Sequence, residues 1–369
     1  MKIVLTGGGT GGHIIPLITV AKKIKEKIGA TETVEFLFIG PKGQLEETLM
    51  AQAGIPAKNV QVGKLRRYFS IHNFVDFFRV PVGVIQALWY LLAYMPDAIF
   101  SKGGYASVPV VLVGWLYRVP ILIHESDSVP GATNDLLGKF STRVAVSYPE
   151  AEKDFPAAQV VLTGNPLRED INKGDPAAAR TLFSLTESRK VIFVYGGSQG
   201  AQVLNNKILE LLPKLLREYQ VIHQTGNNNY EAVVHRAAEY GIKAGREGYH
   251  PLAFIGEELK DILAVSDLVI TRAGANSLSE VAANGKPAIV IPLVGSANDH
   301  QRMNAFSIAR SGGCEVLEEN NLGENLMLGK IKEMMTDEAL RAQLSENIRH
   351  FYHADAADKI AEGIIGMIK

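Results

Sequence analysis

The residues with the clearest chemical potential form a glycine-rich loop, Gly7-Gly8-Gly9-Thr10-Gly11-Gly12-His13, between a hydrophobic run and a helical segment. A loop that follows a strand and opens a helix presents backbone N–H groups beside the positive helix end, which favours phosphate or diphosphate. The loop lacks the Lys-Ser/Thr ending of a P-loop, and its spacing differs from the dinucleotide fingerprint. We therefore predict anion binding without nucleotide hydrolysis. A tight turn with no ligand is the alternative.

The imidazole of His13 stands at the end of this loop. At neutral pH an imidazole accepts a proton from a hydroxyl nucleophile, so His13 is the best candidate for a general base. A purely structural histidine is the alternative.

A second loop, Gly196-Gly197-Ser198-Gln199-Gly200-Ala201, also follows a hydrophobic run and precedes a helical segment. Its backbone donors and the Ser198 hydroxyl suit a second diphosphate. Two anion loops indicate two phosphorylated ligands, which an enzyme with one dinucleotide site does not need.

Two later segments carry polar side chains after predicted strands. In Thr271–Glu280 a turn of small residues leads into a helix, whose start suits phosphate and whose Glu280 suits the two hydroxyls of a ribose. The alternative is that Glu280 is a helix-terminus carboxylate with no part in ligand binding. The segment Asn298–Asn304 supplies amides and an imidazole suited to sugar hydroxyls.

These loops need a scaffold in which hydrophobic strands alternate with amphipathic helices, the pattern of parallel sheets covered by helices on both faces. The predicted strands are Lys2–Thr6, Val34–Ile39, Ala98–Ser101, Ile121–His124, Val144–Val146, Val160–Thr163, Val191–Tyr195, Gln220–Gln224, Leu252–Ile255, Leu268–Thr271 and Ala288–Ile291. The runs at Lys2 and Val191 each lead into a glycine-rich loop, a coarse internal repeat. We therefore predict two nucleotide-binding-like α/β domains with a cleft between them.

The domain boundary is expected at Gly164-Asn165-Pro166. This gives an N-terminal domain over residues 1–164, a C-terminal domain over 165–340 and a helical segment over 341–369. That last segment is expected as two helices broken near His353, packing back on the N-terminal domain.

Composition narrows the possible functions. A net charge of −1 over 369 residues argues against non-specific nucleic-acid binding. The lone Cys314 is expected to be a small core residue. No secretory signal is expected at the N-terminus, and the interrupted apolar stretch 80–95 is shorter than the ~20 residues of a membrane span, so we expect a core or interfacial helix.

The ordered set of motifs closely resembles the MurG family along essentially the whole chain. The matching segments are Gly8–His13, Lys102–Tyr105, His124–Glu125, Gly164–Arg168, Gly196–Ala201 and Gly274–Glu280. The family comprises the N-acetylglucosaminyltransferases of peptidoglycan synthesis, which convert lipid I to lipid II. The resemblance implies a GT-B fold, UDP-GlcNAc as donor, a lipid-linked acceptor, no cofactor and no obligatory metal, and a peripheral place on the cytoplasmic side of the plasma membrane. Cell-wall and division proteins are possible partners.

The resemblance also implies site residues. Donor contacts are expected at Thr10, Gly11, Gly12, Asp127, Arg168, Ser198, Ile255, Ala275, Asn276, Ser277, Leu278, Ser279, Glu280 and Gln301. The acceptor diphosphate is expected at Gly8, Gly9, Gly104 and Tyr105. The catalytic candidates are His13, Glu280 and Asp127.

The sequence departs from the family pattern in two places. His124-Glu125-Ser126-Asp127 stands where the family usually has His-Glu-Gln-Asn, so a carboxylate replaces an amide. Asp127 is therefore a second candidate for the base. Asn276-Ser277 replaces a common Leu-Thr pair.

A basic and aromatic cluster in the N-terminal half suits a membrane surface. The cluster comprises Arg66, Arg67, Phe69, Phe74, Phe77, Phe78, Arg79 and Trp115. For each aromatic residue, burial in the core is the alternative.

The expected reaction is a direct transfer, in which His13 or Asp127 deprotonates the acceptor hydroxyl and the product linkage is β. Two other functions remain open. A UDP-GlcNAc 2-epimerase also uses two facing domains, and a non-catalytic lipid-binding partner of the wall machinery would bind donor without turnover.

Overall fold

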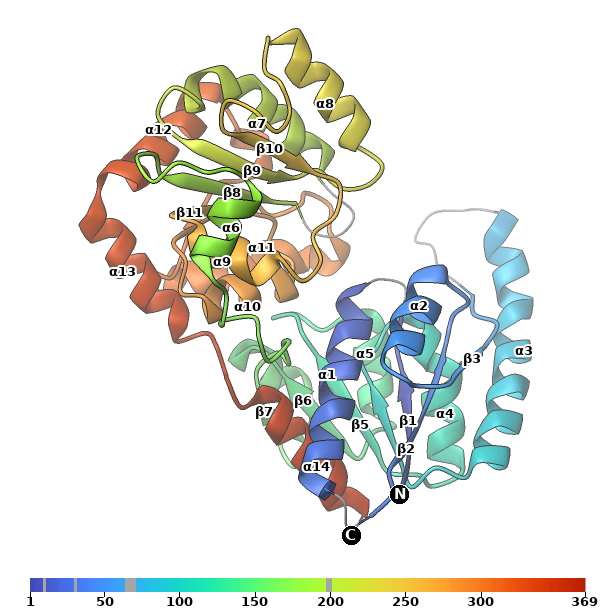
Figure 1. The fold of residues 1–369 in the computed structure, drawn as a ribbon. Helices are drawn as coiled ribbons and strands as arrows, with labels where there is room; N and C mark the ends of the chain where they lie inside the picture. Colours follow the sequence, from blue (N-terminus) through green and yellow to red (C-terminus); the bar gives the residue numbers. More distant parts are fainter. Residues whose placement is uncertain (9–10, 30–31, 64–70, 197–200, 369) are drawn as a thin grey trace. The chain divides into compact units, whose positions relative to one another are not determined.

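The computed structural model describes residues 1–8, 11–29, 32–63, 71–196 and 201–368, with the backbone alone for residues 11 and 71–78. The described chain forms two compact units (Figure 1). One comprises Met1–Arg168 and His353–Lys369, and the other comprises Glu169–Tyr352.

The first unit is built on a seven-stranded parallel sheet in the order β3-β2-β1-β4-β5-β6-β7. Its strands are β1 (Lys2–Thr6), β2 (Glu35–Gly40), β3 (Ala57–Asn59), β4 (Ala98–Ser101), β5 (Ile121–Glu125), β6 (Arg143–Val146) and β7 (Val160–Leu162). The central strands are buried on both faces, which explains their unbroken hydrophobic runs.

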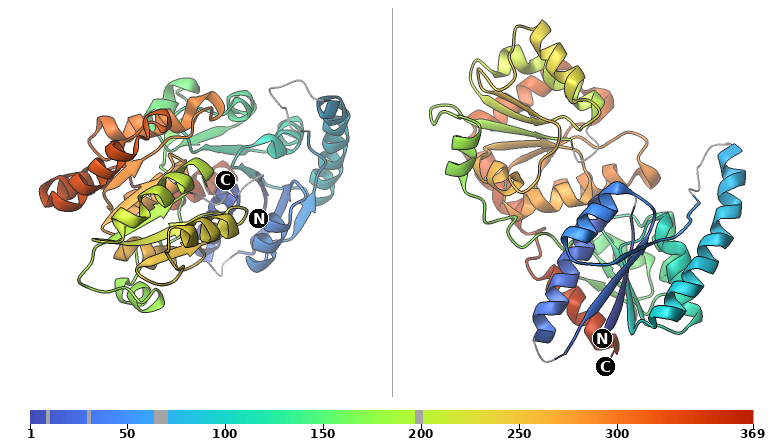
Figure 2. Two further views of the ribbon diagram at one scale, coloured as in Figure 1. Left: turned by 90° about the horizontal axis from the view of Figure 1, so that it is seen from above. Right: turned by 45° about the vertical axis from the view of Figure 1, so that its right-hand side comes forward.

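Helices cover both faces of this sheet (Figure 2). One face packs against α1 (Gly11–Ile28), α2 (Gln44–Gln52) and the last helix, α14 (Ala356–Ile368). The other face packs against α3 (Ile71–Tyr94), α4 (Val108–Leu116) and α5 (Ala132–Gly138). Short 3₁₀ turns, η2 (Tyr105–Ser107) and η3 (Pro149–Asp154), follow β4 and β6.

The second unit has a six-stranded parallel sheet in the order β10-β9-β8-β11-β12-β13. Its strands are β8 (Val191–Tyr195), β9 (Gln220–Gln224), β10 (Tyr249–Leu252), β11 (Leu268–Thr271), β12 (Ala288–Val290) and β13 (Glu315–Val316). One face packs against α7 (Gln202–Leu215), α8 (Tyr230–Glu239), α12 (Glu324–Thr336) and α13 (Glu338–Arg349). The remaining elements of the unit are α6 (Pro176–Leu182), α9 (Leu259–Val265), α10 (Ala275–Ala283), η4 (Ala297–Asp299), α11 (His300–Arg310) and η5 (Glu319–Asn321).

Both sheets have a topological switch point, where the chain leaves neighbouring strands in opposite directions. In the first sheet this point lies between β1 and β4, and in the second between β8 and β11. Loops diverge at the carboxyl ends of such strands and leave a crevice for ligands. The two glycine-rich motifs of the sequence follow β1 and β8, the strands that border these switch points.

The predicted α/β class, with parallel sheets in two Rossmann-like units, is confirmed. One strand was expected too late: β10 covers Tyr249–Leu252, whereas the prediction was Leu252–Ile255. Pro251 lies inside this strand, and it is tolerated there because β10 is at the edge of the sheet. The edge strands β3 and β13 were not predicted.

The C-terminal segment 341–369 contains two helices, as expected, but they do not stay together. Helix α13 belongs to the second unit and α14 to the first, where α14 packs along α1. The change from the first to the second unit follows Arg168, four residues after the boundary predicted from the sequence. Cys314 is buried, as predicted.

Candidate active site

The side chain of His13 contacts the backbone of the loop after β1 at Gly8. Gly8 has φ +140°, and a Cβ atom there would lie 2.6 Å from Pro41, so only glycine fits without displacing the neighbouring loop. His13, in the first turn of α1, has its Nδ1 2.8 Å from the Gly8 carbonyl oxygen. A carbonyl only accepts, so Nδ1 carries the proton and Nε2 carries the lone pair in the neutral ring.

Burial lowers the pKa of His13 from its usual value, and the nearby Lys102 lowers it further, against the opposing effects of the Gly8 carbonyl, Asp127 and Glu46. The neutral imidazole is therefore favoured near neutral pH, with Nε2 available to accept a proton.

The loop after β4 packs directly against this histidine. Gly104 has φ +82°, and a Cβ atom there would lie 3.1 Å from the Gly8 carbonyl oxygen and 3.2 Å from Cε1 of His13. Tyr105 follows and begins η2 half-buried. The two glycine motifs of the first unit thus lie together at the switch point between β1 and β4.

A buried polar network lies beneath these loops. The Lys102 ammonium, 2% exposed, lies 2.6 Å from Nδ1 of His124 and donates to Oδ1 of Asn165 at 3.3 Å. Nε2 of His124 lies 3.0 Å from the Gly164 carbonyl oxygen. Because that carbonyl only accepts, Nε2 is the protonated nitrogen and Nδ1 accepts from Lys102. Burial lowers the pKa of Lys102, and burial together with Lys102 lowers that of His124.

Glu125 shapes the loop that carries Asp127. Its carboxylate accepts from the Asp127 backbone N–H at 2.9 Å, from the Gly131 N–H at 3.1 Å and from the Asn134 amide at 2.9 Å. Burial raises the pKa of Glu125, and the charge of Asp127 raises it further. The half-buried Asp127 is thus held by its backbone in a loop fixed at both ends.

In the second unit, Glu280 projects from α10 toward the end of β8. The Tyr195 hydroxyl donates to its Oε2 at 2.8 Å, and the Tyr195 ring stacks on Phe193 with centroids 5.2 Å apart. The carboxylate of Glu280 is therefore oriented by a ring that is itself held in place. Ala275, Ser277, Leu278 and Ser279 are buried in the same helix, and Asn276 is half-buried.

The loop after β12 is held by Gln301, whose side-chain oxygen accepts from the Leu293 backbone N–H at 3.0 Å. Just before it, Asn298 and Asp299 have φ values of +53° and +55°, conformations that are strained for residues other than glycine. Strain of this kind clusters at functional sites. The buried guanidinium of Arg272 donates to the Ile291 carbonyl at the start of the same loop and forms an ion pair with Glu319. These contacts of Arg272 hold the loop at its β12 end.

Several predicted site residues lie outside the described residues: Gly9, Thr10, Ser198, Arg66, Arg67 and Phe69. Gly11, Phe74, Phe77 and Phe78 lie in helices whose side chains are not described there. Gly12, like Arg168 at the end of the first unit, is half-buried, and Ile255 is buried in the loop after β10.

The sequence analysis named Lys102 only within a matching segment and gave it no role, and it did not identify Asn134 or Tyr195 as supporting residues. A charged residue directly after the predicted strand Ala98–Ser101 was the available signal for Lys102. A hydroxyl at the last position of β8 was the signal for Tyr195. Within the described ranges, no group of three or more His, Cys, Asp or Glu side chains has the arrangement to hold a metal ion.

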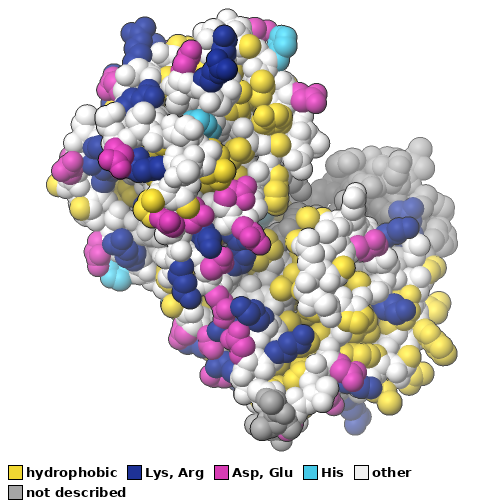
Figure 3. Space-filling model, in the orientation of Figure 1, with side chains coloured by type: hydrophobic (Ala, Val, Ile, Leu, Met, Phe, Trp, Pro, Cys, Tyr) yellow, Lys and Arg dark blue, Asp and Glu magenta, His cyan; other side chains and the backbone are white. Residues whose placement is uncertain are grey.

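The predicted membrane cluster is described only in part. Arg79 is exposed, and Trp115 is 53% exposed while its ring meets Phe140 edge-on. Farther along α3, Ile85, Trp89 and Leu92 are also exposed at helical spacing, and hydrophobic side chains are visible on this side of the first unit (Figure 3). None of the helices described is both long and apolar enough to cross a membrane.

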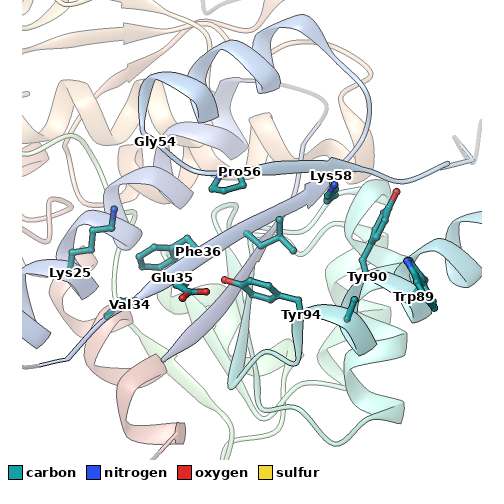
Figure 4. A pocket seen from close by; sticks show the side chains of 12 residues that line it. Lys25, Val34, Glu35, Phe36, Gly54, Pro56, Lys58, Trp89, Tyr90 and Tyr94 are labelled. Atoms are coloured by element: carbon teal, nitrogen blue, oxygen red, sulfur yellow. The ribbon is translucent and has the colours of Figure 1, made fainter.

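A pocket of about 690 Å³ lies away from the glycine loops, at the outer edge of the first sheet (Figure 4). Its wall includes Phe36 of β2 and Trp89, Tyr90 and Tyr94 of α3. It forms beside the first half of β2, because β3 begins only opposite Phe38 and leaves the residues of β2 before it without a neighbouring strand on that side among the described residues. It contains none of the predicted site residues.

Comparison with known proteins identifies the family. Residues 3–146 match the glycosyltransferase family 28 N-terminal domain, and residues 191–360 match the C-terminal domain of the same family. A UDP-N-acetylglucosamine–N-acetylmuramyl-(pentapeptide) pyrophosphoryl-undecaprenol N-acetylglucosamine transferase 2 from Bacillus anthracis is 38% identical over 94% of this chain and 95% of its own. The transferase of the same name, without the number, from Clostridium perfringens (strain SM101) is 37% identical over 100% of this chain and 96% of its own.

Solved structures share the fold. MurG of Acinetobacter baumannii has a TM-score of 0.75 at 24% identity, covering 99% of both chains. A UDP-GlcNAc 2-epimerase from Neisseria meningitidis, bound to UDP-GlcNAc, has a TM-score of 0.69 at 12% identity, covering 99% of this chain and 100% of its own. At these identities the similarity to the solved structures concerns the fold alone. The epimerase structure is therefore no evidence for epimerase activity, whereas the transferase relatives are 37–38% identical in sequence. The chain is an enzyme with the GT-B fold that belongs to glycosyltransferase family 28, within the family of N-acetylglucosamine transferases that includes these relatives.

Proposed function

We propose that this enzyme transfers GlcNAc from UDP-GlcNAc to the muramyl sugar of a lipid-linked, pyrophosphoryl acceptor, with inversion at C1 of GlcNAc. The observation that carries the proposal is the state of His13: its Nδ1 is bound to the Gly8 carbonyl, its pKa is lowered, and its Nε2 is a base in the loop that the family motif defines.

The first unit is proposed to bind the acceptor. Gly8, Gly9, Gly104 and Tyr105 would hold the acceptor diphosphate through backbone N–H groups and the η2 start. The close approach of Gly104 to Gly8 supports a single anion site shared by the two loops.

The second unit is proposed to bind the donor. Glu280 would accept both ribose hydroxyls, a role supported by the Tyr195 hydrogen bond that orients its carboxylate. Ser198 and the start of α10, from Ala275 to Ser279, would hold the diphosphate, and Gln301 would contact the sugar. The remaining donor contacts are proposed at Thr10, Gly11, Gly12, Asp127, Arg168 and Ile255.

The proposed reaction is a single displacement. Nε2 of His13 takes the proton of the acceptor hydroxyl, the hydroxyl oxygen bonds to C1 of GlcNAc, and the bond from C1 to the UDP oxygen breaks with both electrons going to UDP. The departing diphosphate is stabilised by backbone donors at helix starts. Asp127 is the second candidate for the base, because it interacts electrostatically with His13.

Membrane binding is proposed for the basic and aromatic cluster from Arg66 to Arg79 with Trp115. The exposed Ile85, Trp89 and Leu92 would extend it along α3. A peripheral position on the cytoplasmic face would present the site to the acceptor, and cell-wall and division proteins are proposed as neighbours there.

The test is UDP release from UDP-GlcNAc by purified enzyme with a short-chain, lipid-linked muramyl acceptor analogue, compared with His13→Ala. General-base catalysis is worth about 10²- to 10⁴-fold, so the variant should lose at least about 100-fold in turnover. His350→Ala, at a histidine that caps α13 in the second unit, is the matched control and should keep normal turnover.

Release of UDP at equal rates by wild type and His13→Ala would exclude His13 as the base. Conversion of UDP-GlcNAc without any acceptor would instead favour an isomerase. Donor binding with no turnover of either kind would favour a non-catalytic, lipid-binding protein.

A further inference from the structure

The ammonium group of Lys102 is buried without a carboxylate in contact to balance its charge. The side chain is 2% exposed, and its two hydrogen-bond partners, Nδ1 of His124 at 2.6 Å and Oδ1 of Asn165 at 3.3 Å, are both neutral. Among the residues that the structure describes, no carboxylate forms an ion pair with this ammonium. A buried charge is costly unless an opposite charge compensates it, so a carboxylate beyond direct contact is expected to do so.

Two carboxylates follow at the end of the neighbouring strand. β4 pairs with β5 with Ser101 opposite Ile123, so the residue after Ser101 lies beside the end of β5. Glu125 ends β5, and its carboxylate accepts three N–H hydrogen bonds, one of them from the backbone of Asp127. Burial lowers the pKa of Lys102, and the charges of Glu125 and Asp127 oppose this effect. The ends of β4 and β5 therefore bring one cation and two carboxylates into a single cluster.

Asp127 is the charge that the family pattern lacks, because the usual residue at this position is an amide. A carboxylate near a histidine favours the imidazolium, which cannot accept a proton, and a nearby ammonium has the opposite effect. Burial has the largest effect on the pKa of His13 and lowers it, and Lys102 lowers it further. Asp127 raises this pKa, as do the Gly8 carbonyl and Glu46 of α2. Lys102 thus opposes the carboxylate that this chain has gained.

Short contacts connect Lys102 with the loop that holds His13. The backbone N–H of Lys102 donates to the Thr6 carbonyl at 2.9 Å, and a Cβ atom at Gly7 would lie 3.2 Å from Cβ of Lys102. Two residues after Lys102, a Cβ atom at Gly104 would lie 3.2 Å from Cε1 of His13. The residue that carries the ammonium therefore belongs to the same closely packed pair of loops as His13.

We infer that Lys102 is a positioning residue for the transfer, whose ammonium balances the carboxylate of Asp127 and so keeps His13 neutral and able to accept a proton. The inference rests on the proposed function, in which His13 is the general base. The pKa of Lys102 is lowered to about 7, so the ammonium is charged over the more acidic range in which a histidine of lowered pKa takes up its proton. Both charges therefore act on His13 while it titrates.

The first experiment measures the pKa of His13 by NMR titration of the imidazole in the enzyme without substrates, with His13→Ala to assign the signal. The proteins are wild type, Lys102→Met, Asp127→Asn and the double variant. Lys102→Met should raise the pKa of His13 and Asp127→Asn should lower it. Each change should be about 1, because two unit charges about 10 Å apart interact by roughly that amount at an effective dielectric constant of about 20. The double variant should lie near wild type.

Lys102→Gln separates the charge from the hydrogen bond. Its amide can still donate to His124 but carries no charge, so it should raise the pKa of His13 as much as Lys102→Met, with a smaller loss of resistance to urea. Lys286→Met is the matched control in the second unit. Burial also lowers the pKa of Lys286, and its ammonium donates to the Ala264 carbonyl at 2.8 Å. This control should leave the titration of His13 unchanged.

The second experiment is the pH–rate profile of GlcNAc transfer to the lipid-linked acceptor analogue. Its acidic limb should move to higher pH in Lys102→Met and return toward wild type in the double variant. An unchanged titration of His13 in both Lys102 variants overturns the inference, with or without turnover. A double variant that keeps the full change of Lys102→Met overturns it too, because Asp127 is then not the charge that Lys102 balances. The expected titrations in a protein that transfers no GlcNAc overturn the proposed function and leave the charge balance standing.

Discussion

Removing the hydroxyl of Tyr195 is the most informative single-atom change at the proposed donor site. Tyr195→Phe keeps the ring that stacks on Phe193 and removes the 2.8 Å hydrogen bond to Glu280. A hydrogen bond to a charged group contributes about 1.5–3 kcal/mol. Because Glu280 is proposed to hold the ribose, part of this energy should appear as lost UDP affinity, about tenfold.

A double-mutant cycle measures this coupling. UDP affinity is determined by calorimetry for wild type, Tyr195→Phe, Glu280→Gln and the double variant. If Tyr195 acts by orienting the Glu280 carboxylate, the double variant should lose no more affinity than Glu280→Gln alone.

The reasoning is refuted if the two losses simply multiply in the double variant, because Tyr195 and Glu280 would then act independently. It is also refuted if Glu280→Gln binds UDP as wild type does. Unfolding free energies of the four proteins separate a loss of binding from a loss of fold.

Three further predictions concern the supports of the two sites. Burial lowers the pKa of His223 from 6.5 to about 3, so the unfolded chain binds more protons than the folded chain between these pH values. The free energy of unfolding should therefore fall by up to about 1.4 kcal/mol per pH unit as the pH drops through this window. In urea unfolding, His223→Gln should show a smaller dependence of stability on pH. Gly103→Ala should destabilise the enzyme by about 1–3 kcal/mol, because φ is +79° and the new Cβ would lie 2.3 Å from the Asn134 amide. A Cβ atom at Gly131 would contact no other residue, so Gly131→Ala should be near neutral in thermal unfolding. Equal effects of the two substitutions would contradict the packing argument. Asp127→Asn removes a charge that raises the pKa of His13, so the acidic limb of the pH–rate profile should move to lower pH. Turnover should stay within about tenfold of wild type. A loss of activity as large as in His13→Ala would identify Asp127 as the base.

The sequence was sufficient to predict the central strands because each is a short hydrophobic run buried on both faces, as in β1 and β8. The edge strands β3 and β13 have mixed sequences, Ala-Lys-Asn and Glu-Val, that carry no such signal. Their pairing depends on the neighbouring strand, and no local pattern encodes it.

The placement of the first glycine motif and His13 between a strand and a helix was also predictable, because loops that pack closely against their own backbone require glycine at fixed positions. The network beneath them was not. Lys102 meets Asn165 across a sequence separation of 63 residues, and the contact exists only because β4, β5 and β7 end at the same edge of one sheet. The lowered pKa of Lys102 arises from the burial of its ammonium group, which the local sequence does not predict.

The central claim is that one hydroxyl-bearing acceptor receives GlcNAc from UDP-GlcNAc in a single displacement. Its most direct test is analysis of all sugar products by mass spectrometry and NMR, after incubation of the enzyme with UDP-GlcNAc in the presence and absence of the lipid-linked muramyl acceptor analogue. A β-linked GlcNAc–acceptor product is expected with one UDP released per transfer, and UDP-GlcNAc should remain unchanged when the acceptor is omitted. An α-linked product, or a 2-epimer of UDP-GlcNAc formed without acceptor, would contradict it.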